Sequence, residues 1–415
     1  MDLFPNVAGL GSDIGEHTAM KAEPCEGNLR ICCPVPGIPP GLKMTGAAAD
    51  DRNVLNQLAL LGVKVDVILP EGDGLMENGG HGRSLTTREV RIPARPPLAR
   101  HVARIFRFSS AVRSHYREYG FDLLRVHSFF SSCLELLYMR TMYSLPVPFV
   151  AHFYHLDANP WRNFIVRKAL RRCDAVVAIS QASKQQVMTN FGIASSKVHV
   201  IYLGVERRFS PAPPSTNLLR SLGCNADEKI LLFLGTLEPR KNPLFLLDMI
   251  REVSAANAKR KVKLIIAGTG PLLDTIKQKI IQYELESSVV LTGPISEDLK
   301  PAYYNLADVF VFPSTLEGFG LVLGEAMSCG KPVVALNTSA VPEVVEHGVT
   351  GFLANPDDKA DFVRKTLILL DHSELSFQMG ARGRERVDRL FRWERIAKET
   401  FNLYQETVKQ FRSAG

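Results

Sequence analysis

Short apolar runs alternate with longer helix-forming stretches along most of this 415-residue chain. A strand buried in a parallel sheet has a continuous apolar sequence, and parallel strands need a connection long enough to hold a helix. The alternation therefore predicts two α/β domains, each a parallel sheet wrapped by helices. The expected strands are 29–35, 64–69, 123–127, 149–153, 175–179 and 198–203, then 230–234, 263–267, 289–292, 309–313, 332–336 and 351–354.

The length also favours two domains, because a single core rarely grows to this size. Residues 1–27 show no periodicity and are expected to form a loose tail. We expect an N-terminal Rossmann-like domain over 28–209, a proline-containing linker over 210–228 and a C-terminal Rossmann-like domain over 229–389. A polar, glycine-rich loop is expected between residues 70 and 87.

The composition is that of an ordinary soluble protein, with 46% hydrophobic and 22% charged residues. No apolar run reaches the roughly 20 residues that cross a bilayer. The first residues lack the basic-then-apolar order of a secretory signal, so a cytoplasmic location is expected. The seven cysteines show no C-x-x-C spacing, which favours reduced, buried thiols.

The net charge of +7 comes entirely from the first half of the chain. Residues 1–209 hold 25 Lys and Arg against 18 Asp and Glu, whereas residues 210–415 hold 25 of each. Many arginines between Arg88 and Arg117 accompany an amphipathic helix pattern. Such a face favours an anionic membrane surface or a phosphorylated acceptor, and a solvated helix face is the alternative. Nucleic acid is not expected, because no aromatic-interleaved basic motif is present.

The stretch from Ser314 to Pro332 joins two apolar strand-like runs through a turn and one helix. Gly318 and Gly320 allow the backbone to approach a ligand closely. The helix opens near Phe319 to Leu321, where unpaired N–H groups can face an anion or a sugar hydroxyl.

Two glutamates flank this helix start. Glu317 precedes the turn and Glu325 lies inside the helix, so the two can face one pocket at different depths. One carboxylate can accept hydrogen bonds from sugar hydroxyls and the other from the vicinal hydroxyls of a ribose. A nucleotide diphosphate sugar suits this layout, and two solvated helix glutamates are the alternative.

The motif GTLEPRKNP places Arg240 and Lys241 directly after an apolar strand and before a helix. Arginine can clasp phosphate oxygens with paired donors, and lysine adds a point charge. The pair therefore suits a diphosphate, and an exposed basic turn is the alternative.

The spacing of Glu317 and Glu325, within EGFG and GEAMSCGKPVVA, resembles the motif of retaining glycosyltransferases of family 4. The resemblance covers roughly residues 29–410 and implies the GT-B fold, two Rossmann-like domains facing a central cleft. It also implies that Glu317 contacts the donor sugar, Glu325 the ribose, and Arg240 and Lys241 the donor phosphates. The last helix, over 390–415, would cross back onto the N-terminal, acceptor-binding domain.

In the family a glycine-containing loop after the first strand approaches the donor diphosphate, which points to Gly46. The family shows paired glycines there, whereas Thr45 precedes a single one in this chain. Family members also carry a histidine after the strand at 149–153, near the sugar or the acceptor. His155 fits this place best and His152 is the substitute, with a structural histidine as the alternative.

The resemblance implies transfer of a sugar from a nucleotide diphosphate donor to a hydroxyl of a glycan or lipid-linked acceptor, with retention at the anomeric carbon. The TLEPRKN form occurs among mannosyltransferases. No Asp-x-Asp motif is present and the two cations can replace a metal's charge, so we expect neither metal nor cofactor. An epimerase or phosphorylase on the same fold, or a non-catalytic sugar-binding protein, remains an alternative. A nicotinamide oxidoreductase is disfavoured, because G-x-G-x-x-G does not follow the first strand.

Overall fold

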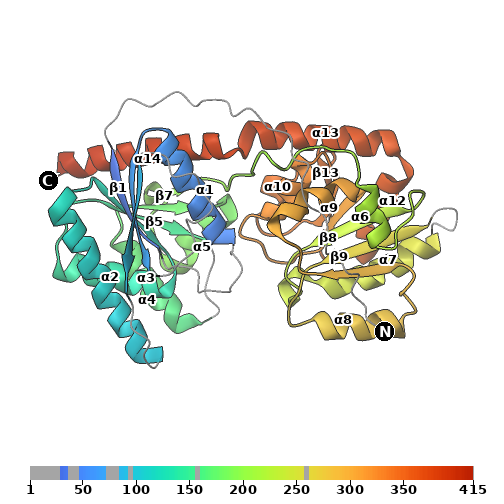
Figure 1. Cartoon of the computed structure of the whole chain (residues 1–415), viewed down its shortest axis with the longest axis horizontal. Coiled ribbons are helices and arrows are strands. Elements are labelled where there is room, and N and C mark those ends of the chain that lie inside the picture. The colour runs from blue at the N-terminus through green and yellow to red at the C-terminus, as the bar shows by residue number, and fades with distance from the viewer. Residues whose placement is uncertain are drawn as a thin grey trace. The chain divides into compact units, whose positions relative to one another are not determined.

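The computed structural model describes residues 29–35, 46–71, 84–91, 97–154, 159–256 and 261–414, with the backbone alone for 46–51 and 97–101. The described residues form two compact units (Figure 1). The N-terminal unit comprises the described residues up to Gly204 together with the last helix from Trp393. The C-terminal unit comprises Val205–Arg392.

Seven strands form the sheet of the N-terminal unit, in the order β3-β2-β1-β4-β5-β6-β7, and every recorded pairing is parallel. The strands are β1 (Arg30–Pro34), β2 (Lys64–Pro70), β3 (Leu85–Val90), β4 (Leu123–His127), β5 (Phe149–Phe153), β6 (Ala175–Ala178) and β7 (Val198–Val200). The helices are α1 (Gly46–Leu60), α2 (Pro97–Tyr119), α3 (Phe130–Met142), α4 (Pro160–Arg171), α5 (Gln181–Phe191) and α14 (Trp393–Ala414), with a 3-10 turn η1 (Ser195–Lys197).

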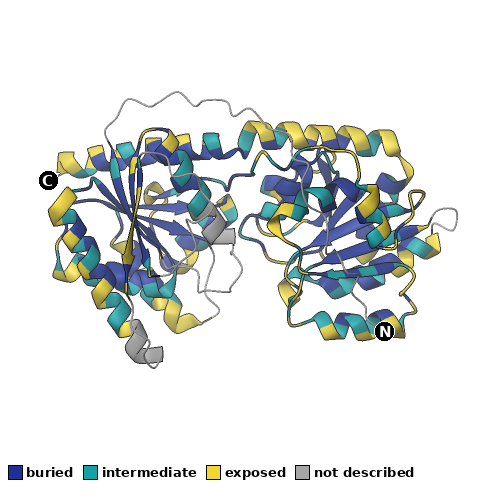
Figure 2. Cartoon of the chain, viewed as in Figure 1, coloured by how far each residue is buried: buried dark blue, intermediate teal, exposed yellow. Residues whose placement is uncertain are grey.

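Helices cover both faces of this sheet, because its strands are apolar on both sides. Ile31 and Cys33 of β1 belong to the core cluster that contains apolar residues of α1 and α14. Cys32, between them, belongs to the cluster formed with α2, α3, α4 and α5. The alternation follows from the two-residue period of a strand. Buried strands between partly exposed helices are visible in Figure 2.

Six strands form the sheet of the C-terminal unit, in the order β10-β9-β8-β11-β12-β13, again with parallel pairings. The strands are β8 (Lys229–Leu234), β9 (Val262–Ala267), β10 (Val289–Gly293), β11 (Val309–Phe312), β12 (Val333–Leu336) and β13 (Gly351–Ala354). The helices are α6 (Thr216–Ser221), α7 (Pro243–Ala256), α8 (Leu273–Gln282), α9 (Lys300–Leu306), α10 (Leu321–Ser328), α11 (Val341–Val344), α12 (Lys359–Asp371) and α13 (Ser373–Leu390), with 3-10 turns η2 (Pro239–Lys241) and η3 (Glu297–Leu299).

Two doubly wound parallel sheets confirm the predicted fold class, and a strand lies at each of the twelve expected places. The loop predicted for 70–87 is wrong at its end, because β3 begins at Leu85 and pairs with β2. The stretch expected as a linker, 210–228, contains α6, whose start is capped by Ser215. The six cysteines of the described residues are buried free thiols, as expected. Within the described part of the chain, no helix is both long and apolar enough to cross a membrane.

Candidate active site

The strand order of the C-terminal unit fixes where a ligand can bind. From β8 the chain adds β9 and β10 on one side, and then returns to place β11 on the other side of β8. Segments leaving β8 and β11 therefore diverge at the carboxyl ends of these strands, where open α/β sheets bind their ligands. Arg240 and Lys241 follow β8, and Glu317 follows β11. The topology thus brings together three residues that the sequence marked in two separate motifs.

A buried ion pair joins the two motifs. The Nζ atom of Lys241 lies 2.5 Å from Oε1 of Glu317, and the exposed fractions of the two side chains are 13% and 6%. Burial lowers the pKa of the Lys241 ammonium, although the Glu317 carboxylate opposes that shift. Nζ also lies 5.0 Å from the centre of the Phe312 ring, a cation–π contact at the end of β11. The pair supplies a fixed charge of each sign at the switch point.

Arg240 occupies the exposed rim of this ion pair. Its guanidinium lies 2.7 Å from the Glu238 carboxylate and 3.7 Å from that of Glu317, and its side chain is 45% exposed. It also donates a hydrogen bond to the carbonyl of Leu316, at 3.2 Å. Arg240 is therefore the cation of this cluster that an anionic ligand can reach with the least rearrangement.

Hydrogen bonds from the loop after β11 hold the two motifs in place. The Ser314 hydroxyl lies 2.5 Å from Oε1 of Glu317 and 3.1 Å from the Arg240 carbonyl. The Thr315 amide donates to the same carbonyl, at 2.8 Å. The role of Ser314 was not predicted, because one of its partners, the Arg240 carbonyl, lies more than seventy residues away in the sequence. Only its place at the end of an apolar strand could have indicated it.

The glycine turn sets the start of α10. Gly320 is the N-cap residue and has φ +93°, a conformation that L side chains rarely adopt. A Cβ there would lie 2.8 Å from Cδ1 of Leu323. Phe319 is buried and its ring meets that of Phe391 edge to face, with centroids 5.4 Å apart. The ring of Phe319 thus anchors the turn, Leu321 begins the helix, and Gly318 lies between Glu317 and this anchor.

Glu325 has a different set of partners from Glu317. It lies in the second turn of α10 and is 3% exposed. The Tyr304 hydroxyl donates a hydrogen bond to Oε2 at 2.7 Å, and the Lys300 Nζ lies 3.8 Å from Oε1. Burial raises the pKa of Glu325, while Lys300 and the Tyr304 hydrogen bond oppose the shift. Tyr304 and Lys300 belong to α9, and their contact with Glu325 could not be predicted from the sequence pattern.

The remaining predicted residues belong to the N-terminal unit. Gly46 is the first residue of α1, directly after a stretch that lies outside the described residues. His155 also lies outside them. The substitute, His152, is buried in β5, where its Nε2 lies 2.8 Å from the Tyr404 hydroxyl of α14. Burial lowers the pKa of His152 well below its usual value. These contacts give His152 a structural place in the core.

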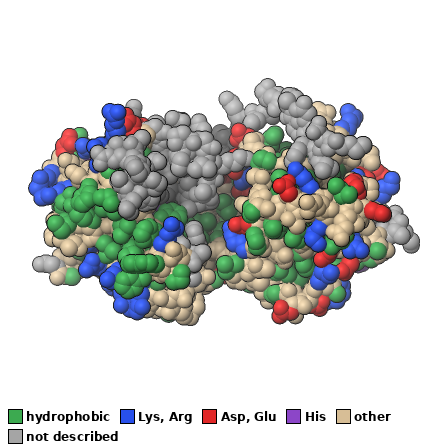
Figure 3. Space-filling model, turned by 90° about the horizontal axis from the view of Figure 1, so that it is seen from below, with side chains coloured by type: hydrophobic (Ala, Val, Ile, Leu, Met, Phe, Trp, Pro, Cys, Tyr) green, Lys and Arg blue, Asp and Glu red, His purple; other side chains and the backbone are tan. Residues whose placement is uncertain are grey.

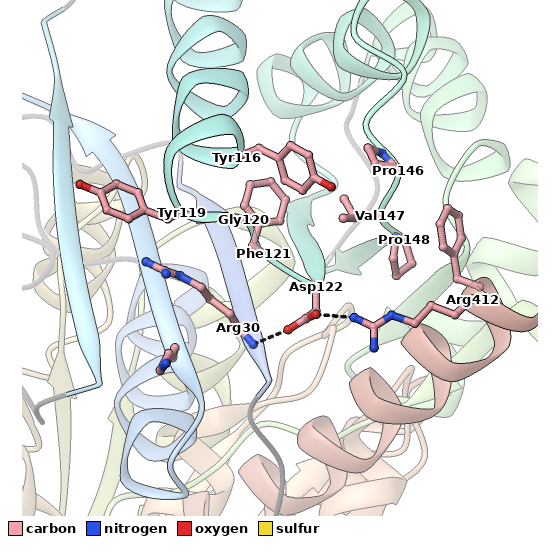
Figure 4. Close-up of a pocket in the computed structure, with 12 residues that line it drawn as sticks. Arg30, Tyr116, Tyr119, Gly120, Phe121, Asp122, Pro146, Val147, Pro148 and Arg412 are labelled. Carbon is pink, nitrogen blue, oxygen red and sulfur yellow. Dashed lines mark hydrogen bonds and ion pairs between the residues drawn. The ribbon is translucent and has the colours of Figure 1, made fainter. Parts of the chain in front are cut away.

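A cavity of about 390 Å³ lies in the N-terminal unit, with Arg30, Asp122, Tyr116 and Arg412 among its lining residues (Figure 4). It opens beside the amino ends of β1, β2, β4 and β5. That is the edge opposite to the one where parallel sheets bind ligands. Asp122 bridges the backbone N–H of Arg30 and the guanidinium of Arg412 there. The cavity is therefore separate from the predicted site residues.

No group of three or more metal-binding side chains occurs among the described residues. The charges at the switch point are instead those of Arg240, Lys241, Glu238 and Glu317. Two cations and two carboxylates can hold a polar anionic ligand through hydrogen bonds and charge.

Comparisons with known proteins match both halves of the chain to family models. Residues 51–209 match the model described as Glycosyltransferase Family 4, and residues 215–386 match Glycosyl transferases group 1. An uncharacterised glycosyltransferase of Methanocaldococcus jannaschii is 30% identical over 277 residues, which cover 65% of this chain and 69% of that protein.

Two further proteins are similar to this chain, one in sequence and the other in structure. A GDP-mannose-dependent alpha-(1-6)-phosphatidylinositol monomannoside mannosyltransferase of Mycobacterium tuberculosis is 32% identical over 251 residues, 56% of this chain and 63% of that protein. The solved sucrose-phosphate synthase of Thermosynechococcus elongatus superposes with a TM-score of 0.74 at 22% identity, covering 94% of this chain and all of that one. This last likeness concerns the fold alone.

Proposed function

Because the chain belongs to the glycosyltransferases of group 1 and family 4, we propose that it transfers a sugar from a nucleotide diphosphate donor to an acceptor hydroxyl, with retention at the anomeric carbon. One observation carries the proposal: Arg240, Lys241 and Glu317 meet at the topological switch point of the C-terminal unit. Cations beside a positioned carboxylate match a ligand that joins a diphosphate to a polyhydroxyl ring.

The contacts described above suggest a role for each residue of the proposed donor site. Arg240, the exposed cation, makes the first contact with the diphosphate, and Lys241 adds charge while its ion pair orients Glu317. Glu317 accepts hydrogen bonds from sugar hydroxyls, and the backbone amides of Phe319, Gly320 and Leu321 approach the same ligand. Glu325, held by the Tyr304 hydroxyl, accepts hydrogen bonds from the ribose.

The proposed chemistry needs no protein nucleophile. As the bond from the anomeric carbon to the diphosphate oxygen breaks, negative charge builds on the diphosphate and positive charge on the sugar ring. Arg240 and Lys241 stabilise the leaving diphosphate electrostatically. The acceptor oxygen attacks from the face that the diphosphate leaves, and a diphosphate oxygen takes the acceptor proton. Glu317 is then a positioning residue and not a nucleophile of the glycosidase kind.

Two roles rest on the family resemblance alone. Gly46 is assigned to the donor phosphates and His155 to the region of the transferred sugar. The acceptor is assigned as a glycan or a lipid-linked molecule, since the mycobacterial relative is named for a phosphatidylinositol mannoside and for GDP-mannose. We also propose a cytoplasmic location. A nucleotide-linked mannose is the first donor to test.

A nucleotide screen tests the donor site. Thermal unfolding is measured with UDP, GDP, ADP and dTDP on the parent chain and on Glu325→Ala and Lys241→Ala, with the exposed Glu286→Ala as the matched control. One nucleotide should raise the melting temperature of the parent and of the control, and raise it less in the two site variants. Equal stabilisation of all four proteins would contradict the assigned site, and no stabilisation by any nucleotide would contradict the donor class.

A turnover assay tests the reaction. The nucleotide sugar that carries the selected base is incubated with candidate acceptors, and the product's anomeric configuration is read by NMR. Retention and dependence on acceptor are expected, whereas inversion refutes the mechanism and donor consumption without acceptor indicates an epimerase. Activity should persist after chelation, since the two cations supply the charge. Activity that chelation abolishes and Mg²⁺ or Mn²⁺ restores would refute this last point.

A further inference from the structure

The exposed large apolar side chains of the described residues are unevenly distributed. Ten are exposed, and six of them lie on α2, α3 and α4, helices of only 23, 13 and 12 residues. They are Val102, Phe106, Tyr119, Met142, Trp161 and Phe164. Single exposed apolar residues are normal, whereas a cluster of them indicates an interaction surface. We call the outer surface of α2, α3 and α4 the three-helix face.

These helices form one continuous surface. They lie side by side on one face of the sheet, with α3 in contact with both others. The Phe106 ring of α2 meets that of Tyr138 on α3, at 5.1 Å between centroids, and the Arg162 guanidinium of α4 lies 5.6 Å from the Phe130 ring of α3. Figure 3 shows apolar side chains gathered over this unit, with Lys and Arg beside them. The three-helix face is therefore a broad apolar surface with cations on it.

The three helices together carry a strongly positive charge. The three helices contain ten Lys and Arg against two Asp and Glu, a net charge of +8, whereas the whole chain has +7. Helix α4 holds four of these cations and no carboxylate. One of them, Lys168, places its Nζ 4.6 Å from the centre of the Phe164 ring. Apolar contact and positive charge are thus combined within single turns of helix.

Several of the exposed apolar residues lie near the first turns of their helices. Each helix follows the carboxyl end of a strand, so its first turns lie toward the edge where parallel sheets bind ligands. Trp161 is the second residue of α4 and is 66% exposed, and its ring contacts that of Phe164 at 5.8 Å. Phe106 and Val102 lie in the first half of α2. The exposed aromatic residues Trp161, Phe164 and Phe106 therefore lie toward that edge, whereas Tyr119 lies at the other end of α2.

We propose that the three-helix face docks on an anionic lipid bilayer, with Trp161, Phe164, Phe106 and Val102 entering the interface. A bilayer presents delocalised negative charge and needs no shape complementarity, which fits exposed cations spread over α2 and α4. Tryptophan is enriched at membrane–water boundaries. The sequence suggested a membrane-binding surface over Arg88–Arg117. The proposed surface differs in two ways: Arg88 lies on β3 and not on these helices, and the exposed apolar residues continue onto α4.

The placement of the two tryptophans provides a direct readout. Trp161 is exposed on α4, whereas Trp393 is 5% exposed in the core of the same unit. The full chain is mixed with vesicles of phosphatidylcholine alone, or with an equal part of phosphatidylglycerol, and both sedimentation and fluorescence are followed. Binding and a blue shift of Trp161 emission are expected with anionic vesicles alone. Trp161→Phe should remove the shift, because only the buried Trp393 remains.

Charge variants test the face itself. Arg167→Gln with Lys168→Gln should weaken binding to anionic vesicles by about 25-fold, at about 5-fold for each cation near the surface. The matched control, Arg382→Gln with Arg384→Gln on α13, removes the same charge from the C-terminal unit and should bind as the parent does. Phe164→Ser should weaken binding several-fold, and the exposed Phe377→Ser of α13 should not.

Several outcomes would overturn the proposal. They are binding to neutral and anionic vesicles alike, binding to neither, an unshifted Trp161 in sedimented protein, or equal losses in the face and control variants. A dimer in solution that Trp161→Phe or Phe164→Ser dissolves would assign the three-helix face to a second copy of the chain. The proposal adds a location to the proposed transfer, and vesicle binding is measured without donor or acceptor. Its failure is therefore distinguishable from a failure of the transfer reaction.

Discussion

Replacing Lys241 by methionine removes one charge of the buried pair at the switch point and keeps the length of the side chain. The Glu317 carboxylate, 6% exposed, then retains the Ser314 hydroxyl at 2.5 Å and the Arg240 guanidinium at 3.7 Å. Neither of these two groups compensates the negative charge of Glu317 as well as the Lys241 ammonium does at 2.5 Å. The variant therefore leaves a largely buried carboxylate without its closest counter-charge.

The expected loss of stability is about 3 kcal/mol, the lower end for removing one partner of a buried ion pair. For a unit of this size that loss corresponds to a fall of roughly 6–12 °C in the melting temperature. Glu317→Gln in the same chain should recover much of the lost stability, because an amide is neutral.

Differential scanning calorimetry of the single and the double variant measures both effects. Arg240→Met is the control, since its guanidinium is 45% exposed and its ion pairs are worth less than about 1 kcal/mol. The reasoning fails if Lys241→Met costs no more than the control, or if adding Glu317→Gln recovers nothing.

Three further predictions concern other buried or strained groups. Gly320→Ala should destabilise the chain more than Gly348→Ala in urea unfolding. Both glycines have positive φ, which costs an alanine about 1 kcal/mol, but of the two only Gly320 has a neighbour within 4 Å of the added Cβ. Tyr304→Phe should cost about 1.5–3 kcal/mol by removing a hydrogen bond to the Glu325 carboxylate, and a loss below 0.5 kcal/mol would mean that this bond is not formed. Burial lowers the pKa of His127 well below its usual value, so the unfolded chain binds the extra proton and stability falls as the pH drops below about 6.5. His127→Phe should reduce that fall by about 1.4 kcal/mol at pH 5.5, and an unchanged pH profile would contradict a neutral buried imidazole.

The parallel sheets could be predicted because their strands are short apolar runs, such as Val309–Phe312 and Phe149–Phe153. The edge strand β3 was not predicted, because Leu85–Val90 has four exposed residues between two buried ends and no apolar run. A strand of this kind is recognised by its pairing with β2, which is a tertiary contact. The same holds for α6, where a serine cap and one buried leucine define a helix within a proline-rich stretch.

The charged residues of the candidate site could be predicted, but their hydrogen-bonding partners could not. Arg240, Lys241 and Glu317 each follow a parallel strand, so the sequence pattern placed them at one edge of a sheet. Ser314 and Tyr304 carry ordinary side chains whose role depends on what the fold brings to them. No periodicity or spacing contains that information.

The discontinuity of the N-terminal unit bears on the synthesis of the chain. Helix α14 contributes Trp393, Ile396, Phe401 and Tyr404 to the same apolar cluster as β1, although the whole C-terminal unit separates them in the sequence. During synthesis the sheet of the N-terminal unit therefore waits for α14, while residues 205–392 of the C-terminal unit are complete before α14 is made. A chain that stops at Arg392 would have a finished C-terminal unit and an N-terminal sheet with part of its apolar face open to chaperones, proteases and aggregation.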